Sequence, residues 1–260
     1  MKKLNVLVVA MGLMTSASAL AQDTLRYGIE SQYPPFESRN ASGELEGFDI
    51  EMGEAVCQAA KMKCQWVESS FDALIPALSA KKFDAINSSM NITEARARSV
   101  AFTKPIYRIP SMLVGKLDSG LTDATAEGLK GKSIGVLQGS IQETYAKQHW
   151  EPKGVTVTSY QDQNQVYTDM VAGRLDGTLV MSAAGQSGFL NSPQGKGFGF
   201  IGKAVDDDKI LGTGIGFGLR KDDTQLKAKL DAAITQIQND GTITKLAAKF
   251  FPGIDVSVKE

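Results

Sequence analysis

Apolar and polar residues alternate along the chain with two different periods, one typical of strands and one typical of helices. Residues 24–29 alternate as a half-buried strand does, and the segment from Gly47 to about residue 60 has apolar positions at helical spacing. This order recurs along the chain. We expect further strands at 64–68, 83–88, 133–136, 155–160 and 177–180, and helices at 72–80, 93–99, 140–148, 163–172, 223–240 and 242–250. The pattern predicts an α/β fold with mostly parallel sheets.

Two long extended segments interrupt this rhythm. Residues 102–115 contain two prolines, and residues 209–220 have glycine at every other position from Gly212 to Gly218. We expect two lobes, each a small sheet with helices, joined by these segments as two crossing strands. Lobe one would be discontinuous, and a ligand should bind in the cleft at the carboxyl ends of the strands. The expected boundaries are 22–108 with 213–260 for lobe one, and 111–207 for lobe two.

The N-terminal segment has the features of a secretory signal peptide. Lys2 and Lys3 precede an apolar run over residues 4–13, and Ala19-Leu20-Ala21 is a small-residue cleavage motif. The run is too short to span a membrane. We therefore expect residues 1–21 to be removed and the mature chain to be exported.

Composition and charge exclude several classes of function. The 260 residues carry a net charge of −1, which gives no reason to expect nucleic acid or an acidic membrane as a partner. His149 is the only histidine and is expected to be exposed, so neither histidine-dependent hydrolysis nor a histidine metal site is supported. The only cysteines, Cys57 and Cys64, favour a disulfide over a metal site in an oxidising compartment.

Residues 88–96 place hydroxyls, an amide and an arginine where a predicted strand ends and a predicted helix begins. Asn91 or Thr93 is suited to cap the helix, and Arg96 in its first turn offers a planar fork for a carboxylate or phosphate. Unpaired N–H groups at a helix start also favour an anion. A capped surface helix with a solvated arginine explains the same residues, so this stretch alone leaves both interpretations open.

Several longer motifs occur together and in order. They are Gly47-Phe48-Asp49-Ile50-Glu51, residues 71–78, residues 88–96, residues 131–140 and residues 172–177. With these motifs the mature chain resembles the periplasmic solute-binding proteins of polar amino-acid ABC transporters, most closely the lysine/arginine/ornithine-, arginine- and histidine-binding group.

The resemblance implies a role for each candidate residue of lobe one. Arg96 would bind the ligand carboxylate, with Ser88 and Ser89 adding hydroxyl and backbone contacts. Asn91 stands where relatives usually carry a serine, which alters that contact. Tyr33 and Phe71 would sandwich the ligand side chain, and ordinary core packing is the alternative for both aromatics. Glu30 would bind a cationic tip.

The resemblance also implies the second half of the site and the partners. Leu137, Ser140 and Gln142 would close the site from lobe two, and Cys57 and Cys64 would form a small disulfide loop. No metal or cofactor is implied. The expected partners are an amino acid or derivative and an inner-membrane ABC permease, and the protein would be a periplasmic monomer.

One position departs from the family pattern. Relatives hold the ligand α-ammonium with an aspartate, and the corresponding residue here is Met181. Losing a hydrogen bond to a charged group costs on the order of 1.5–3 kcal/mol. Either another group binds the ammonium or the ligand lacks a free one, as in opines, which are amino acids N-substituted with a carboxyl-bearing group.

An enzymatic alternative comes from the same resemblance. The fold includes periplasmic dehydratases of the cyclohexadienyl type, which use a carboxylic acid in the cleft as general acid. Glu30 is the candidate acid here. The motifs at 71–78 and 88–96 are more similar to the transport group, which favours a carrier that is not an enzyme.

Overall fold

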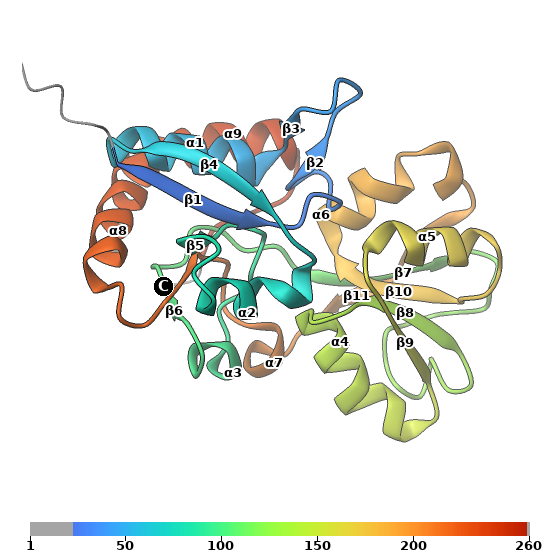
Figure 1. Ribbon diagram of the computed structural model, residues 1–260. Helices are drawn as coiled ribbons and strands as arrows, with labels where there is room; N and C mark the ends of the chain where they lie inside the picture. The colour runs from blue at the N-terminus through green and yellow to red at the C-terminus, as the bar shows by residue number, and fades with distance from the viewer. Residues whose placement is uncertain (1–22, 259–260) are drawn as a thin grey trace, which may run out of the picture.

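The computed structural model describes residues 23–258, so the expected signal peptide at residues 1–21 lies outside the described residues. The chain forms two lobes, each built on a five-stranded sheet (Figure 1). The two-lobed α/β fold is the architecture that the alternating pattern predicts. The exact lobe boundaries stay a prediction, which the distribution of strands between the two sheets supports.

The first sheet takes its strands from both ends of the chain. Its order is β4-β1-β5-β12-β6, and the helices α1, α8 and α9 pack against one another beside it. The strands of this sheet are β1 (Thr24–Ile29), β4 (Lys63–Glu68), β5 (Ala85–Ile86), β6 (Ala101–Phe102) and β12 (Gly218–Leu219). The helices of lobe one are α1 (Phe48–Ala59), α2 (Leu74–Ser79), α3 (Glu94–Ala97), α8 (Thr224–Asn239) and α9 (Thr242–Phe250), and a small hairpin adds β2 (Ser38–Arg39) and β3 (Leu45–Glu46).

The second sheet is formed by the middle of the chain, in the order β11-β7-β10-β8-β9. Its strands are β7 (Ser111–Lys116), β8 (Ser133–Leu137), β9 (Thr156–Tyr160), β10 (Gly177–Met181) and β11 (Phe198–Val205). Its helices are α4 (Ile141–Tyr145), α5 (Gln163–Val171) and α6 (Ser182–Gly185), and the short α7 (Asp208–Leu211) begins the segment that returns to lobe one.

Both sheets are mixed rather than mostly parallel. In the first, β1 pairs parallel with β4 and β5, while β12 pairs antiparallel with β5 and β6. In the second, β8 pairs parallel with β9 and β10, while β7 pairs antiparallel with β10 and β11. The strands that pair only in an antiparallel direction, β6, β7, β11 and β12, lie within or next to the segments that cross between the lobes, and their direction follows from that crossing.

Three further differences from the expected elements are found. The segment predicted as extended over residues 209–220 begins as helix α7, whose N-cap Asp207 accepts a hydrogen bond from the Ile210 N–H at 3.0 Å. Strand β11 was not predicted, because its glycines at 199 and 202 weaken the strand pattern. Helix α3 is also shorter than the 93–99 segment that the sequence suggests.

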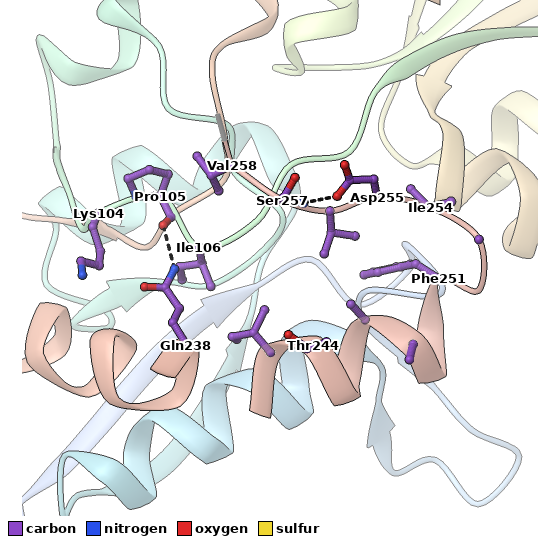
Figure 2. Close-up of a pocket in the computed structure, with 15 residues that line it drawn as sticks. Lys104, Pro105, Ile106, Gln238, Thr244, Phe251, Ile254, Asp255, Ser257 and Val258 are labelled. Atoms are coloured by element: carbon purple, nitrogen blue, oxygen red, sulfur yellow. Dashed lines mark hydrogen bonds between the residues drawn. The ribbon is translucent and has the colours of Figure 1, made fainter. Parts of the chain in front are cut away.

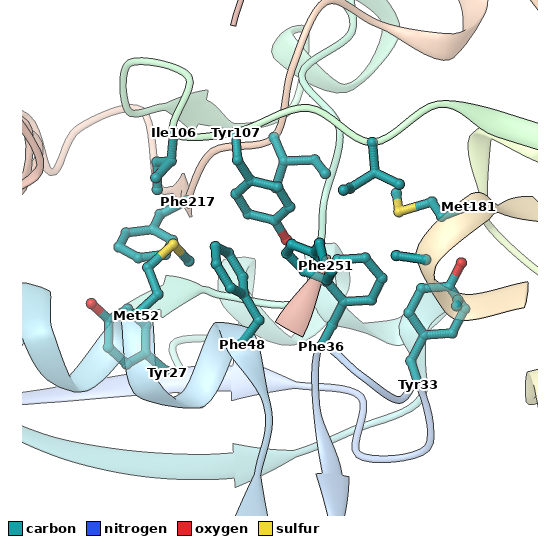
Figure 3. Packing of buried hydrophobic residues seen from close by; sticks show 14 of the residues in the cluster. Tyr27, Tyr33, Phe36, Phe48, Met52, Ile106, Tyr107, Met181, Phe217 and Phe251 are labelled. Atoms are coloured by element: carbon teal, nitrogen blue, oxygen red, sulfur yellow. The ribbon is translucent and has the colours of Figure 1, made fainter. Parts of the chain in front are cut away.

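One buried apolar cluster includes residues of both lobes. The aromatic rings of Phe48, Phe36, Tyr107 and Phe251 pack on one another within it, with ring centroids 4.6–6.4 Å apart. Figure 3 shows Met181 of lobe two approaching Tyr33 at one end of the same cluster. Three buried members of this cluster, Tyr33, Leu137 and Met181, also line a cavity between the lobes.

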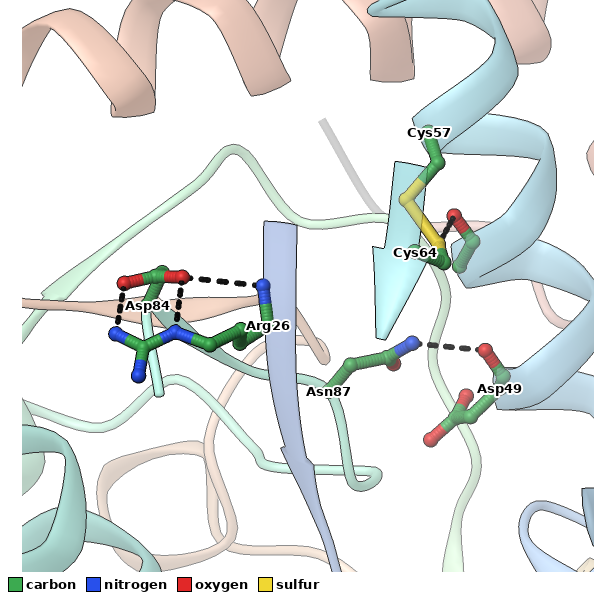
Figure 4. The surroundings of a disulfide bond; sticks show 7 residues. Arg26, Asp49, Cys57, Cys64, Asp84 and Asn87 are labelled. Atoms are coloured by element: carbon green, nitrogen blue, oxygen red, sulfur yellow. Dashed lines mark hydrogen bonds and ion pairs between the residues drawn. A yellow bond between two sulfur atoms is a disulfide. The ribbon is translucent and has the colours of Figure 1, made fainter. Parts of the chain in front are cut away.

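A disulfide joins Cys57 near the end of α1 to Cys64 in β4 (Figure 4). The predicted pairing is therefore present. The bond closes a loop with a sequence separation of seven. This loop follows the C-terminal part of α1, the helix whose first turn carries Asp49.

Replacing both cysteines with alanine should lower the free energy of unfolding by about 2–3 kcal/mol, because the bond restricts the unfolded chain. Urea unfolding of the double variant and the wild type measures the difference. Alkylation of the native wild type followed by mass spectrometry should label neither cysteine. Equal unfolding midpoints, or labelling of both thiols, would contradict the prediction.

Candidate functional site

A small cavity lies between the lobes and brings together nine of the ten predicted site residues. Its volume is about 20 Å³, room for roughly one water molecule. Residues of both lobes line it: Tyr33, Phe71, Ser88, Ser89, Asn91, Arg96, Leu137, Ser140, Ile141, Gln142 and Met181. Only Glu30 of the predicted set is absent, and Ile141 and Met181 were not among the predicted contacts.

The lobe-one wall is the loop that follows β5. Ser88, Ser89 and Asn91 are buried in it. Thr93, not Asn91, caps the short helix α3, and its hydroxyl accepts the Arg96 N–H at 3.2 Å. The Asn91 amide instead donates to the Leu211 carbonyl at 3.2 Å, which ties this loop to the returning segment.

Arg96 is a cation that no carboxylate within residues 23–258 neutralises. Its partners there are two backbone carbonyls, with Nη1 2.9 Å from the Asn91 oxygen and Nη2 3.0 Å from the Gly139 oxygen. Its guanidinium also lies 5.4 Å from the centre of the Phe71 ring. Burial lowers the pKa of Arg96 to about 10, so the side chain stays charged at neutral pH. An anion entering the cavity would meet this charge.

The lobe-two wall is the start of α4 together with the end of β10. Ser140 caps α4 by accepting the Glu143 N–H at 3.0 Å. The Gln142 amide donates to the Ser111 hydroxyl at 2.9 Å, which leaves its carbonyl oxygen available to the cavity. Met181 is buried where β10 ends and contributes only apolar surface.

The two walls touch across the cavity. Arg96 of lobe one bonds the Gly139 carbonyl of lobe two, and the Gln138 amide donates to Asp72 at 3.0 Å. Gly139 has a φ of +76°, and a Cβ there would lie 2.9 Å from the Asp72 Cα. Only glycine therefore allows this close approach of the lobes.

Glu30 lies beside the cavity rather than in its lining. It contributes to an adjoining hollow of about 340 Å³ that Asp162 of lobe two also lines, and its backbone N–H donates to the Ser88 hydroxyl at 3.0 Å. Burial, against a hydrogen bond from the Gln32 N–H, raises the pKa of Glu30 to about 7. A buried carboxyl with this pKa is ready to pair with a cation.

The prediction missed a pair of buried acids behind the lobe-one wall. Glu37 is 1% exposed and Asp49 is fully buried, and the Asp49 charge, together with burial, raises the pKa of Glu37. Gly47, with a φ of +129° and no room for a Cβ against the Phe36 carbonyl, turns the chain so that α1 starts beside this pair. Nothing in the sequence pattern marks Glu37, although Asp49 lies within one of the motifs that carry the resemblance.

A larger cavity, of about 760 Å³, lies within lobe one (Figure 2). The C-terminal residues 253–258 cover it, and its polar groups bond within the chain: the Gln238 amide donates to the Pro105 carbonyl at 3.3 Å and the Ser257 N–H to Asp255 at 2.9 Å. Since it involves one lobe and none of the predicted residues, we place the candidate site at the smaller cavity.

Two further classes of site find no support within residues 23–258. No group of three or more histidine, cysteine or acidic side chains there could hold a metal ion. No helix in that part of the chain has the length and apolar character needed to cross a membrane. His149 is exposed as expected, and its Nε2 lies 3.4 Å from Asp207.

A two-lobed α/β protein with an arginine and several hydroxyl groups around a cavity between its lobes has the architecture of a solute-binding protein. The model of the family described as bacterial extracellular solute-binding proteins, family 3, matches residues 25–253. The chain belongs to this family, as its sequence motifs predict.

Individual relatives agree with this assignment. The histidine-binding periplasmic protein of Salmonella typhimurium is 46% identical over 254 residues, covering 96% of this chain and 97% of the relative. The lysine/arginine/ornithine-binding periplasmic protein of Escherichia coli is 46% identical over 252 residues, covering 96% of each. A solved Salmonella typhimurium periplasmic binding protein with high arginine specificity matches with a TM-score of 0.81 at 29% identity, covering 88% of this chain and 99% of that one.

The raised pKa of Glu30 makes stability depend on pH. Between about pH 4.5 and 7 the folded state holds a proton that the unfolded chain releases, so the free energy of unfolding falls as pH rises, by on the order of 3 kcal/mol in all. Glu30→Gln removes this titration and keeps an oxygen for the Gln32 N–H. We expect the variant to match the wild type near pH 4.5 and to exceed its stability at pH 8.

Urea unfolding of both proteins at the two pH values, without ligand, measures this effect. Burial and the Asp49 charge act on Glu37 in both proteins and come before Glu30 among the causes of its raised pKa, so most of the Glu37 contribution cancels in the comparison. A difference in unfolding free energy that is the same at pH 4.5 and pH 8 would show that Glu30 has an ordinary pKa.

Proposed function

We propose that this protein captures a polar or cationic amino acid, or an amino-acid derivative, and delivers it to an ABC permease of the inner membrane. The observation that carries the proposal is the charge of Arg96, which faces the interlobe cavity without a carboxylate partner among the described residues. A ligand carboxylate would supply the missing negative charge. The names of the relatives, which are histidine-, lysine/arginine/ornithine- and arginine-binding proteins, support the same class of ligand.

The other lining residues support a defined pose. The carboxylate would lie between Arg96 and the start of α4, where the Ser140 hydroxyl retains a proton to donate. Tyr33 and Phe71 would flank the ligand side chain, and Leu137 would cover it from lobe two. Asn91 and Gln142 would add amide contacts. The adjoining hollow beside Glu30 would receive a cationic tip.

The cavity has little free volume, so ligand entry requires the lobes to separate. Two hydrogen bonds cross the cleft beside the cavity: Arg96 with the Gly139 carbonyl and Gln138 with Asp72. Hydrogen bonds to charged groups contribute about 1.5–3 kcal/mol each, and a ligand can replace them. Opening and closing about the two crossing segments is the motion that this arrangement favours.

Export, the periplasm and a monomeric state complete the proposal. The signal-like N-terminus and the Cys57–Cys64 disulfide support an oxidising compartment outside the cytoplasm. The relatives are named as periplasmic proteins. A permease that recognises the closed form is the partner that such a carrier requires.

Met181 favours a variation on this ligand class. It lines the cavity where relatives carry an acid for the α-ammonium, so lobe two supplies no charge there. An opine, whose amine bears a carbon substituent, would place apolar surface against the methionine. The alternative ligand is therefore an opine or another N-substituted amino acid.

Binding rather than catalysis is the function proposed. Glu30, with its pKa near 7, would suit a general acid, but it lies outside the cavity lining, and the relatives are named as binding proteins. Turnover of prephenate or arogenate by the purified protein would instead support the dehydratase alternative.

Arg96→Ala should abolish high-affinity binding while the fold persists. Losing a buried charged partner costs about 2–5 kcal/mol, or roughly thirty- to several-thousandfold in Kd. Titration calorimetry with basic amino acids, neutral amino acids and opines measures this loss after a thermal-shift screen has identified the best ligand. Arg98→Ala, an exposed arginine two residues away, controls for the change in net charge. Equal affinity of the Arg96→Ala variant and the wild type would refute the site.

Met181→Asp should weaken binding of the best natural ligand, because an added carboxylate would be buried in the closed cleft without a partner unless it took up a proton. Met181→Leu keeps the apolar surface and should bind nearly as the wild type does. Calorimetry with arginine, lysine, octopine and nopaline separates the cases. A Met181→Asp protein that gains affinity for arginine, from a wild type that already prefers arginine, would show that the cavity lacks an ammonium partner.

A further inference from the structure

The hydroxyl of Ser88 has only one hydrogen-bonding site left for the cavity. Its proton is donated to Glu37 Oε1 at 2.7 Å, and one of its lone pairs accepts the Glu30 N–H at 3.0 Å. A hydroxyl has one proton and two lone pairs. What remains is a lone pair, so Ser88 can accept a hydrogen bond from a ligand but cannot donate one.

The hydroxyl of Ser89 is committed in the same way. It lies 3.0 Å from Asp49 Oδ2 and 3.1 Å from the Tyr107 hydroxyl. The Tyr107 hydroxyl donates its own proton to Asp49 Oδ1 at 2.7 Å. The Ser89 hydroxyl therefore donates its proton either to Asp49 Oδ2 or to the Tyr107 oxygen, and both acceptors are buried. Its φ of +48° also turns its backbone N–H onto Asp49 Oδ2, at 2.6 Å. Ser89 therefore also offers lone pairs alone.

The pair of acids behind these serines holds one proton and one negative charge. Asp49 accepts the Tyr107 hydroxyl and the Ser89 N–H, and the Ser89 hydroxyl lies 3.0 Å from its Oδ2, which suits the ionised form. Glu37 has only the Ser88 hydroxyl, on Oε1, while its buried Oε2 finds no donor within residues 23–258. Burial and the nearby Asp49 charge raise the pKa of Glu37 well above its usual value. When Glu37 is protonated and donates this proton to Asp49, the hydrogen-bonding capacity of both carboxyls is satisfied.

Two other lining residues have the reverse character. Arg96 offers only donors, and Ser140 uses a lone pair to cap α4, which leaves its proton free. The cavity thus presents donors from Arg96 and Ser140 and acceptors from Ser88 and Ser89. An α-amino acid carries an acceptor carboxylate and a donor ammonium on the same carbon, which matches this division.

We infer that Glu37 and Asp49 act as positioning residues that fix Ser88 and Ser89 as hydrogen-bond acceptors for the α-ammonium of the ligand. This inference rests on the proposed function and deepens it. The amine is held by lobe one, one hydroxyl away from the Asp49 charge, so no acid is needed at Met181. A secondary ammonium, as in an opine, still has two N–H donors and satisfies the same acceptors, whereas an N-acylated amine has lost its charge and does not.

The test compares arginine with its 2-hydroxy analogue, argininic acid, by titration calorimetry. The analogue keeps the carboxylate and the side chain and replaces only the ammonium. Ser88→Ala should reduce arginine affinity about ten- to a hundredfold, the loss of a hydrogen bond to a charged group, while argininic acid changes much less. Glu37→Met removes the oxygen that holds the Ser88 proton, which then turns toward the cavity, so the preference for arginine should fall similarly.

Glu37→Gln distinguishes positioning from a merely structural role. Its amide can accept from Ser88 and donate to Asp49, as the protonated acid does, so it should recover most of the discrimination that Glu37→Met loses. In a Ser88→Ala background, Glu37→Met should have little further effect on the ratio of the two dissociation constants. Thermal unfolding without ligand checks that each variant is folded.

The possible outcomes distinguish a failure of this inference from a failure of the proposed function. Equal losses for arginine and argininic acid in Ser88→Ala, or Glu37→Met and Ser88→Ala effects that simply add, would overturn the inference and leave the proposed function standing. Loss of discrimination in Glu37→Gln would show that Glu37 acts as an ionised carboxylate and would overturn the shared proton. A wild type that binds no amino acid or opine would refute the proposed function, and this inference with it.

Discussion

The carboxyl group of Asp49 lies fully buried beneath the lobe-one wall, and its hydrogen bonds connect three segments: α1, a crossing segment and the cavity loop. It accepts the Tyr107 hydroxyl from the crossing segment, and the Ser89 N–H and hydroxyl lie against it from the cavity loop. A buried carboxylate without such partners would be costly by several kcal/mol. Satisfying this one group therefore fixes the loop that carries Ser88 and Ser89, and Figure 4 shows Asn87 held to the Asp49 carbonyl as well.

The rest of the cavity depends on short helices whose first turns are capped by side chains. Thr93 caps α3 and so fixes where Arg96 emerges, and Ser140 caps α4 on the opposite lobe. Each cap contributes about 1 kcal/mol to stability. Displacing the charged Arg96 side chain from its hydrogen-bond partners would cost more. Gly139 lets the two helix starts approach each other, so the Arg96 charge is shared between the lobes. A ligand carboxylate would compete with these backbone carbonyls for the same donors.

Local patterns were enough to predict the architecture, because helix and strand periods are properties of contiguous residues. The capped turn at residues 88–96 indicated part of the cavity in the same way, and the resemblance to solute-binding proteins supplied the other lining residues. Strand β11 and helix α7 could not be predicted in this way. Strand β11, at the edge of its sheet, is defined by its pairing with β7. The side chain of Asp207 caps helix α7, which replaces the start of the segment expected to be extended. Glu37 was missed for the same reason. Glu37 is buried because the segment just before β2, helix α1 and the loop after β5 pack together around it. No spacing along the chain reveals this packing.

The charges around the cavity show why acids can be set back from the lining. A carboxylate in direct contact with the ligand, such as an aspartate at Met181 would be, binds an ammonium strongly but is left unpaired when the cavity is empty. Asp49 has its hydrogen bonds from Ser89 and Tyr107 without any ligand, so its charge costs little in the unliganded protein. The serine hydroxyls transmit that charge as oriented dipoles, which weakens the attraction while preserving its direction. Glu30 accepts a single such hydrogen bond, from the Gln32 N–H, and burial raises its pKa to about 7.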